Sequence, residues 1–185
     1  MSWVLREHPT PRGEFVLIDG PEGLAALDFA HAGARRRRLM ATRFGDVELE
    51  SGPCVDSVGR LDRYLAGELR AFEGVRLQLG GTAFQRRVWA ALLEIPAGET
   101  RGYGELAAQL GLKPGASRAV GLANGANPVS IAVPCHRVVG ADGSLTGYAG
   151  GLPLKRWLLA HEGVPLRGDR VLTATEAAQA DLFGR

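Results

Sequence analysis

A cysteine stands directly before a histidine in the run PCHRV, at residues 134–138. The thiol of Cys135 has an ordinary pKa of about 8.5, so it reacts as a thiolate only beside a base or in a positive field. His136 is a base of the right kind. Three interpretations compete for Cys135: a nucleophile, a metal ligand, or a small hydrophobic residue of the core, which is the usual role of a lone buried cysteine.

The local backbone decides whether the pair can cooperate. Neighbouring side chains on an extended strand point to opposite faces, so His136 can serve Cys135 only if the chain turns there or a water bridges them. Pro134 favours a turn or a helix start, which would also bring Cys135 near backbone amide donors. A histidine base needs its second ring nitrogen held, usually by a carboxylate. The chain offers three acidic candidates by residue type: Glu105, Asp142 and Glu162.

Composition limits the class of protein. The chain has 185 residues, of which 45% are hydrophobic, enough for one ordinary domain or for a main domain with a smaller partner. Its two cysteines, Cys54 and Cys135, cannot build a disulfide scaffold, and the sequence has no CxxC pair or four-ligand set for structural zinc. We therefore expect free thiols and no metal site.

Charge and hydropathy single out no partner. The net charge is +2, which neither establishes nor excludes binding to nucleic acid. Arginines at 35–38 form a concentrated basic run, and such a run is most often a solvated helix face, with direct DNA contact as the alternative. No stretch approaches the roughly 20 apolar residues of a membrane-spanning helix, and the first residues carry charges and prolines where a signal peptide is apolar. The expected location is the cytoplasm.

The elements that must position the site begin with a small N-terminal α/β domain, predicted over residues 1–79. Apolar runs at 15–18 and 24–29 flank a Gly-Pro-Glu-Gly turn, which is the pattern of a β-hairpin. Apolar residues then recur at spacings of three and four from Val58 to Leu69, which predicts one buried helical face. The fold class is therefore α+β.

A mostly helical C-terminal domain is predicted over residues 80–165. Thr82 and Gln85 form a capping box that opens a helix ending before Pro96. A last helix covers the run LPLKRWLLAHEG, with a proline near its start and a glycine at its end. The weakly patterned residues 166–185 are predicted to be a C-terminal tail whose end frays.

Between these helices, two short ones at about 103–110 and 116–123 are joined by a turn containing Lys-Pro-Gly, which is typical of a helix-turn-helix. The second short helix carries mainly small residues: Ser117, Ala119, Gly121 and Ala123. Such a smooth face can approach a DNA groove closely, and Arg118 could reach into a base stack. The ordinary alternative is tight helix packing with Arg118 in solvent.

These motifs together resemble a known family. The run PCHRV, preceded by ANP at 126–128 and followed by TGYAGG and KRWLLAHEG, resembles the O6-alkylguanine-DNA alkyltransferases over roughly residues 81–163. The resemblance implies a ribonuclease H-like N-terminal module. It also implies a DNA repair protein that binds duplex DNA through its helix-turn-helix, flips out the damaged guanine and moves the alkyl group irreversibly to its own cysteine. We expect one turnover per molecule and no cofactor.

The resemblance implies a role for each matching catalytic residue. Cys135 is the acceptor, His136 is the base acting through water, and Glu162 orients His136. Asn127 matches the hinge between the DNA-reading helix and the active-site segment. Tyr103 matches the tyrosine that helps to turn the nucleotide out and donates to the guanine ring.

DNA and substrate contacts follow in the same way. Arg118 matches the arginine that fills the space left by the flipped guanine. Three small residues of its helix would lie at the groove: Ser117, Ala119 and Gly121. The substrate pocket would be closed by four residues: Val138, Tyr148, Ala149 and Gly150. Position 149 is alanine where relatives can carry serine.

The expected partner is duplex DNA carrying O6-alkylguanine, bound by a monomer and away from membranes. O4-alkylthymine is a further candidate substrate, and cooperative binding along DNA is an open alternative. Related proteins that bind lesions without repairing them carry tryptophan in place of this cysteine, so its presence favours repair. Two alternative functions predict different behaviour. A cysteine hydrolase would turn over repeatedly without DNA, and a DNA-binding regulator would keep its function without Cys135.

Overall fold

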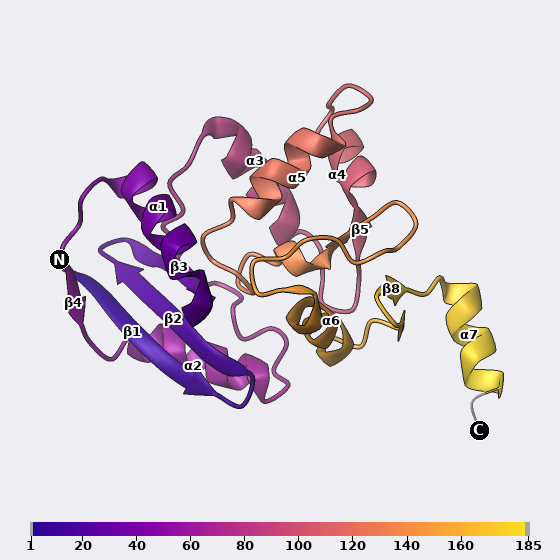
Figure 1. The fold of residues 1–185 in the computed structure, drawn as a ribbon, viewed down its shortest axis with the longest axis horizontal. Coiled ribbons are helices and arrows are strands. Elements are labelled where there is room, and N and C mark those ends of the chain that lie inside the picture. The colour runs from indigo at the N-terminus through magenta and orange to yellow at the C-terminus, as the bar shows by residue number, and fades with distance from the viewer. Residues whose placement is uncertain (1, 184–185) are drawn as a thin grey trace.

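The computed structural model describes residues 2–183 and has a mixed α+β fold (Figure 1). The N-terminal elements are β1 (Trp3–Thr10), β2 (Gly13–Gly20), β3 (Gly23–Phe29), η1 (Ala30–Ala32), α1 (Gly33–Phe44), β4 (Leu49–Ser51) and α2 (Val55–Leu65). They are followed by α3 (Ala83–Leu93), β5 (Arg101–Gly102), α4 (Tyr103–Gln109), α5 (Ser117–Gly125), η2 (Cys135–Arg137), β6 (Val138–Val139), α6 (Leu152–His161), β7 (Leu166–Arg167), β8 (Arg170–Val171) and α7 (Ala174–Phe183). The sheet β1–β4 lies at one end of the molecule and α7 projects at the other.

The main sheet has the order β3-β2-β1-β4, in which β3, β2 and β1 are antiparallel and β4 runs parallel to β1. The predicted hairpin over residues 15–29 is confirmed, with Leu17 opposite Leu27. Residues 15–18 of β2 are all apolar because both faces of the strand are buried. Leu17 lies in the main core, and Ile18 packs with Met40 of α1 on the other face. The sequence did not predict β1, whose residues WVLREHPT mix charges and a proline with the apolar positions.

Helix α2 is shorter than the apolar spacing predicts. It ends at Leu65, and Leu69 lies in the turn that follows, although it still packs against the core. Gly67 explains the end of the helix, because its φ of +107° cannot continue a right-handed helix. The buried face of α2 includes Leu61 and Tyr64, both nearly inaccessible to solvent.

The predicted C-terminal helices are present. The capping box of α3 is formed: Gln85 N donates to Thr82 Oγ1 at 3.2 Å, and Thr82 N donates to Gln85 Oε1 at 3.0 Å. Helices α4 and α5 contact each other across the intervening turn (Figure 1). Helix α6 begins with Pro153 in its first turn, and Gly163, at φ +83°, follows its C-cap.

One hydrophobic core joins the two parts of the chain. It contains Leu27 of β3 and Trp89 of α3, both fully buried. Leu27 also pairs with the segment that leads to the cysteine, since its N donates to Pro128 O at 3.1 Å and its O accepts from Ser130 N at 2.7 Å. Strand β3 therefore fixes the backbone of this segment, although the two lie on opposite sides of the predicted domain border at residues 79–80.

The predicted C-terminal tail contains regular structure although its sequence is weakly patterned. Residues 166–171 form the hairpin β7–β8, and α7 follows. Thr173 and Glu176 cap α7 reciprocally: Thr173 N donates to Glu176 Oε2 at 2.8 Å, and Glu176 N donates to Thr173 Oγ1 at 3.3 Å. This capping signal is visible in the sequence. The end of this tail is predicted to fray, and its last residues, 184–185, lie outside the described residues.

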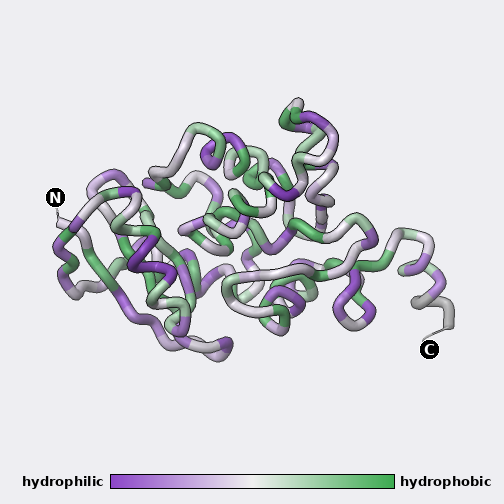
Figure 2. Tube along the Cα trace, turned by 45° about the horizontal axis from the view of Figure 1, so that its top comes forward, coloured by the Kyte–Doolittle hydropathy of each residue, from purple (hydrophilic) through white to green (hydrophobic). Residues whose placement is uncertain are grey.

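Hydropathy along the chain follows this architecture. Figure 2 shows hydrophilic turns in α1, where the arginine run lies, beside apolar stretches of the neighbouring strands. Among residues 2–183, no helix has the length and apolar character needed to cross a membrane.

Candidate active site

Two tight turns bring the cysteine into place. Ile131 has φ +70°, and the next amide donates to the Ser130 carbonyl at 2.8 Å, which together define a strained γ-turn. Pro134, at φ −80° and ψ 60°, centres an inverse γ-turn in which Cys135 N donates to Val133 O at 2.8 Å. The predicted turn at Pro134 is confirmed. Because η2 follows directly, Cys135 and His136 lie on a 3-10 turn and not on opposite faces of a strand.

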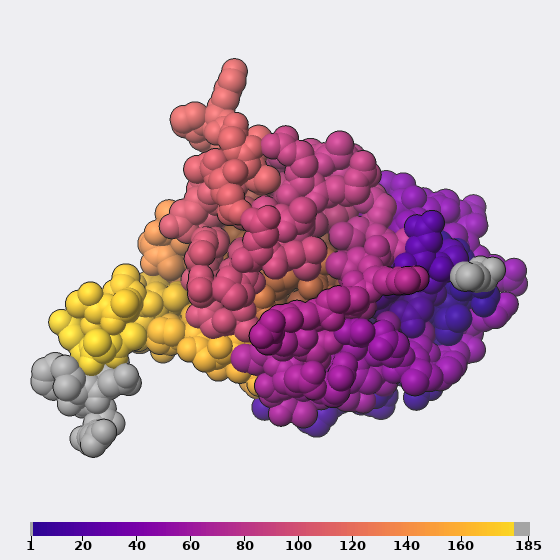
Figure 3. Space-filling model, turned by 180° about the vertical axis from the view of Figure 1, so that it is seen from behind, coloured from indigo at the N-terminus to yellow at the C-terminus, as the bar shows by residue number. Residues whose placement is uncertain are grey.

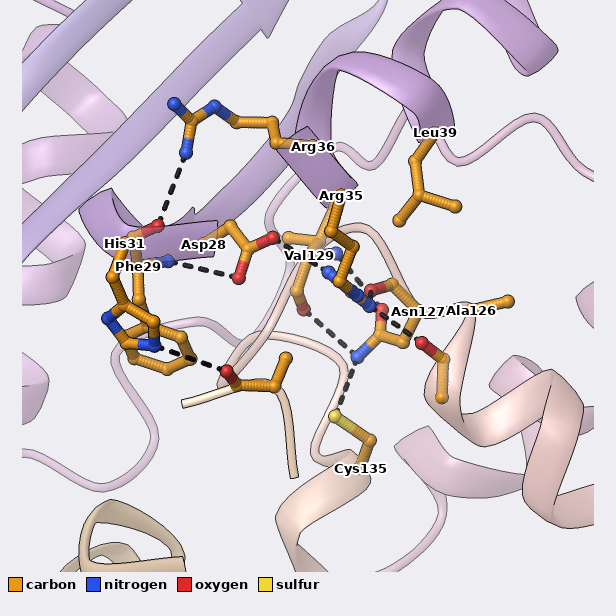
Figure 4. Close-up of polar contacts among 12 residues, drawn as sticks. Asp28, Phe29, His31, Arg35, Arg36, Leu39, Ala126, Asn127, Val129 and Cys135 are labelled. Atoms are coloured by element: carbon orange, nitrogen blue, oxygen red, sulfur yellow. Dashed lines mark hydrogen bonds and ion pairs between the residues drawn. The ribbon is translucent and has the colours of Figure 1, made fainter. Parts of the chain in front are cut away.

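Cys135 is 6% exposed, and its thiol is held by Asn127 (Figure 4). Asn127 Nδ2 donates to Cys135 Sγ at 3.0 Å and to Val133 O at 2.8 Å, while Oδ1 accepts from Val129 N at 3.0 Å. These backbone partners fix the amide with its donor toward sulfur. The sequence predicted backbone amides near the thiol, whereas the donor observed here is a side-chain amide.

Opposing effects set the protonation of this thiol. Burial raises the pKa of Cys135 above its ordinary value, and the Asn127 hydrogen bond and the positive charges of Arg35 and Lys155 oppose that rise. The thiol is therefore the resting form, and a base must take its proton during reaction.

His136 can be that base. Its ring is fully buried, and Nε2 lies 2.9 Å from Glu162 Oε1. Since the carboxylate accepts, Nε2 carries the proton and Nδ1 has the free lone pair. Among the residues that the structure describes, Nδ1 has no hydrogen-bond partner. Burial lowers the pKa of His136, and Glu162 opposes this, so the neutral ring with a basic Nδ1 is favoured.

Glu162 is the centre of a buried group that we call the Glu162 cluster, formed with Tyr64, His136 and Arg137. Oε1 accepts from Tyr64 OH at 2.7 Å, from His136 at 2.9 Å and from Arg137 Nη2 at 2.8 Å, and Oε2 accepts from Arg137 Nε at 2.8 Å. Burial raises the pKa of Glu162, but the donors His136 and Arg137 outweigh it and hold the pKa below its usual value. These partners explain an acid at the C-terminal end of α6, where the helix dipole disfavours it.

The other two acidic candidates point elsewhere. Glu105 Oε2 accepts from Gly102 N at 2.6 Å at the start of α4. Asp142 Oδ1 accepts from Ser144 N at 3.0 Å in an exposed turn. Neither forms a hydrogen bond with His136 in the described part of the chain, so the structure selects Glu162.

Lys155 belongs to the site although the sequence analysis gave it no role. Its side chain is fully buried, and Nζ donates to Val138 O at 2.6 Å and to Thr146 O at 3.0 Å. Burial lowers the pKa of Lys155 to about 8, and the nearby Cys135 opposes this. The sequence does contain a signal for this burial. Lys155 stands three and four residues before Leu158 and Leu159, and that spacing places it on the same inward face of the helix.

The residues predicted to close the substrate pocket lie around the cysteine segment. Val138 is buried, and the Tyr148 ring lies edge-on to His136 with centroids 6.4 Å apart. Ala149 O is 3.3 Å from His31 Nε2 of the N-terminal part. A Cβ at Gly150 would come within 2.7 Å of Phe29, so this position requires glycine.

A large cavity of about 970 Å³ lies on the other side of the cysteine segment. Its walls include Tyr64, Ile95, Pro134 and Arg137, but not Cys135 itself. Figure 3 shows the face on which it opens, between the magenta residues that follow α2 and the end of α3. The volume of a cavity alone therefore does not locate the candidate site, because neither Cys135 nor His136 lines this one.

Helix α5 presents the predicted DNA-binding residues at the surface. Arg118 and Ala119 are exposed, while Ser117 and Gly121 are half-buried. Arg118 forms no hydrogen bond or ion pair with another residue in the part of the chain described. Leu122, one turn later on the same face, is 72% exposed, an apolar side chain that the sequence analysis overlooked.

Tyr103 lies between this helix and the cysteine region. It is the first residue of α4, and a Cβ on Gly121 of α5 would lie 3.7 Å from its ring. Its hydroxyl accepts a hydrogen bond from Thr146 Oγ1 at 3.1 Å. Thr146 also bonds Lys155 through its carbonyl, so Tyr103 is linked to the same buried region as Val138.

The arginine run is only in part a solvated face: Arg37 and Arg38 are exposed, whereas Arg35 and Arg36 are half-buried. Arg35 of α1 pairs with the buried Asp28 at 2.7 Å and donates to the carbonyls of Gly125 at 2.8 Å and Asn127 at 2.7 Å (Figure 4). Arg43, about two turns later on α1, donates to the Ala126 carbonyl. The two arginines thus satisfy carbonyls at the C-terminal end of α5, where a positive charge is also favoured by the helix dipole.

Comparison with known proteins adds independent information. Residues 83–164 match the family model described as "6-O-methylguanine DNA methyltransferase, DNA binding domain". A protein of Salmonella typhimurium named methylated-DNA--protein-cysteine methyltransferase is 47% identical over 158 residues, which cover 83% of this chain and 92% of that protein. The protein of the same name from Mycobacterium tuberculosis H37Rv is 60% identical over 113 residues, which cover 61% of this chain and 67% of that protein.

The fold has solved counterparts. The crystal structure of Mycobacterium tuberculosis OGT in complex with DNA superimposes with a TM-score of 0.73 at 46% identity, and the match covers 86% of this chain and 92% of that one. Both parts of the fold, and not the matched domain alone, are therefore shared with this structure.

Proposed function

Because the chain belongs to the methylated-DNA--protein-cysteine methyltransferases, we propose that it repairs DNA by moving the alkyl group from O6 of an alkylated guanine to Sγ of Cys135. The observation that carries this proposal is a buried thiol that accepts from Asn127 and stands next to a histidine bound to Glu162. An acceptor, an orienting donor, a base and its carboxylate are the parts that such a transfer needs.

The chemistry follows from these positions. The thiol proton passes through a water to Nδ1 of His136, and Sγ attacks the alkyl carbon in line with its bond to O6. As the carbon–sulfur bond forms, the carbon–oxygen bond breaks and its electron pair moves onto the guanine, which takes up a proton. We assign that proton to Tyr103. The product is a thioether that the site has no means to cleave, so each molecule acts once.

DNA is bound, on this proposal, by α4 and α5 acting as a helix-turn-helix. Arg118 enters the duplex where the damaged base leaves, and the small residues beside it allow α5 to lie close to the minor groove: Ser117, Ala119 and Gly121. The exposure of Arg118 and Ala119 supports this assignment. Phosphate contacts make binding weaken as salt rises.

The remaining proposals concern the fold and the assembly. We take the sheet of β1–β4, with three antiparallel strands and a parallel fourth, to be a ribonuclease H-like module. The protein is proposed to act as a monomer on duplex DNA carrying O6-alkylguanine, without a cofactor.

A matched pair of cysteine variants tests the function. Purified protein is incubated with duplex DNA carrying a radiolabelled O6-methylguanine, and label bound to protein is counted. Cys135→Ser is expected to take up no label while it still binds the DNA. Cys54→Ser, which changes the other buried thiol, is expected to take up as much label as the unchanged protein. Equal uptake by both variants would refute Cys135 as the acceptor.

A further inference from the structure

We propose that Tyr64, a residue of the N-terminal helix α2, is a positioning residue for alkyl transfer, because its hydroxyl holds the carboxylate oxygen to which His136 is bound. The inference rests on the proposed function. It gives the N-terminal part a share in the reaction beyond packing, through a side chain 98 residues away from Glu162 in sequence.

The geometry places Tyr64 on the reacting side of the carboxylate. Its hydroxyl donates at 2.7 Å to Oε1 of Glu162, the same oxygen that accepts from His136 at 2.9 Å. Tyr64 is 1% exposed, and its backbone carbonyl lies 2.7 Å from Nε2 of His161, the last residue of α6. The phenol is thus fixed at both its tip and its backbone.

The hydroxyl stays a donor throughout the working pH range. Burial raises the pKa of Tyr64 far above its ordinary value, and the charge of Glu162 raises it further. A buried phenol needs an acceptor, and any carbonyl would meet that need. Sharing an oxygen with the catalytic histidine has an additional effect, because each donor on Oε1 makes that oxygen a weaker acceptor for the others.

This effect acts on the basicity of His136. With Tyr64 in place, Glu162 holds the Nε2 proton less strongly, so the neutral form of the ring is favoured and Nδ1 is free to act as the base. The charged and titratable groups around His136 come from several elements: Tyr64 of α2, Cys135 and Arg137 of η2, Tyr148 of the following loop, Lys155 of α6 and Glu162 at its end. The positive charges of Arg137 and Lys155 also disfavour protonation of the His136 ring. Tyr64 carries no charge and acts on the ring through the Glu162 carboxylate.

The test compares Tyr64→Phe with the unchanged protein. The variant keeps the ring in the core and removes one donor, so the pKa of His136 rises. Single-turnover transfer from O6-methylguanine duplex is measured from pH 5 to pH 9. We expect the acid limb of the rate profile to move by about one half to one pH unit toward alkaline pH, a roughly three- to tenfold loss of rate on that limb. The two curves should approach one another at alkaline pH, where the histidine is neutral in both.

Ser57→Ala is the matched control. Ser57 lies on the same helix, is also buried, and donates to the carboxylate of Asp19 at 2.5 Å, away from the cysteine. Its rate profile should keep the wild-type acid limb. If Tyr64→Phe lowers the rate equally at every pH, or leaves the profile unchanged while the wild type transfers normally, the positioning role is wrong. If the wild type itself transfers no alkyl group, the proposed function fails instead.

Discussion

The substitution Glu162→Gln tests the buried cluster most severely. Glu162 accepts four hydrogen bonds, two of them from the Arg137 guanidinium, and is 4% exposed. A glutamine has the same shape but no charge, and its NH2 group must face one of these donors. The variant leaves the guanidinium of Arg137 buried without a counter-charge. Removing one partner of a buried ion pair costs about 3–5 kcal/mol.

That loss is large enough to measure in two ways. At about 2–4 °C per kcal/mol for a chain of this size, the Tm should fall by roughly 6–20 °C in thermal unfolding followed by circular dichroism at pH 7.5. Single-turnover transfer should also slow sharply at a temperature where the variant is still folded, because His136 loses the acceptor that fixes its tautomer. An unchanged Tm or an unchanged rate would refute the ion-pair argument.

The pH dependence of stability in acid is a further test of the Glu162 ion pair. The pKa of Glu162 in the folded protein lies below its ordinary value of 4.5, so its contribution to stability is present above that pH and is lost as the pH falls. The difference in unfolding free energy between the wild type and Glu162→Gln should therefore shrink below about pH 4.5. Glu73→Gln is the control, since Glu73 forms a similar two-bond pair with Arg70 but is exposed. It should leave Tm and transfer unchanged.

Three further predictions concern neighbouring residues. Arg118→Ala should slow transfer from duplex DNA much more than transfer from free O6-methylguanine, as measured in parallel single-turnover assays, because only the duplex must be opened; equal losses would exclude a role in flipping. Asn127→Ala removes the donor at Cys135 Sγ, so the pKa of the thiol rises and the pH profile of its alkylation by iodoacetamide should move to higher pH; an unmoved profile would contradict the Asn127 assignment. Folding lowers the pKa of Lys155 from 10.5 to about 8, so its contribution to the free energy of unfolding increases as the pH rises between these values. Between pH 7.5 and pH 9.5, the unfolding free energy from denaturant titration should therefore increase less for Lys155→Met than for the wild type. An equal increase in both proteins would refute the buried charge.

Local signals in the sequence were sufficient for much of the fold. The capping box at Thr82 and the proline and glycine that bound α6 act within a few residues, so sequence reasoning could locate these helices. The turn at Pro134 was predictable for the same reason. Two local signals were overlooked: the Thr173 cap of α7, and Gly67, which ends α2 before Leu69.

The rest of the site depends on contacts between distant segments. Tyr64 reaches Glu162 across 98 residues, and Arg35 reaches Asn127 across 92. No spacing rule predicts such pairs, because they arise only when the sheet and the helical part share one core. Arg35 is an example. The composition of the arginine run indicates a solvated face, whereas the fold gives Arg35 a buried carboxylate and two helix-end carbonyls as partners.

The central claim is that Cys135 receives the alkyl group, once and irreversibly. Its most direct test is the intact mass of the protein before and after incubation with excess duplex DNA carrying O6-methylguanine, followed by peptide mapping. The account predicts a gain of one methyl group, found on the peptide that contains Cys135, with no further turnover on longer incubation. An unchanged mass, a methyl group on Cys54, or repair of more than one equivalent of DNA would contradict it.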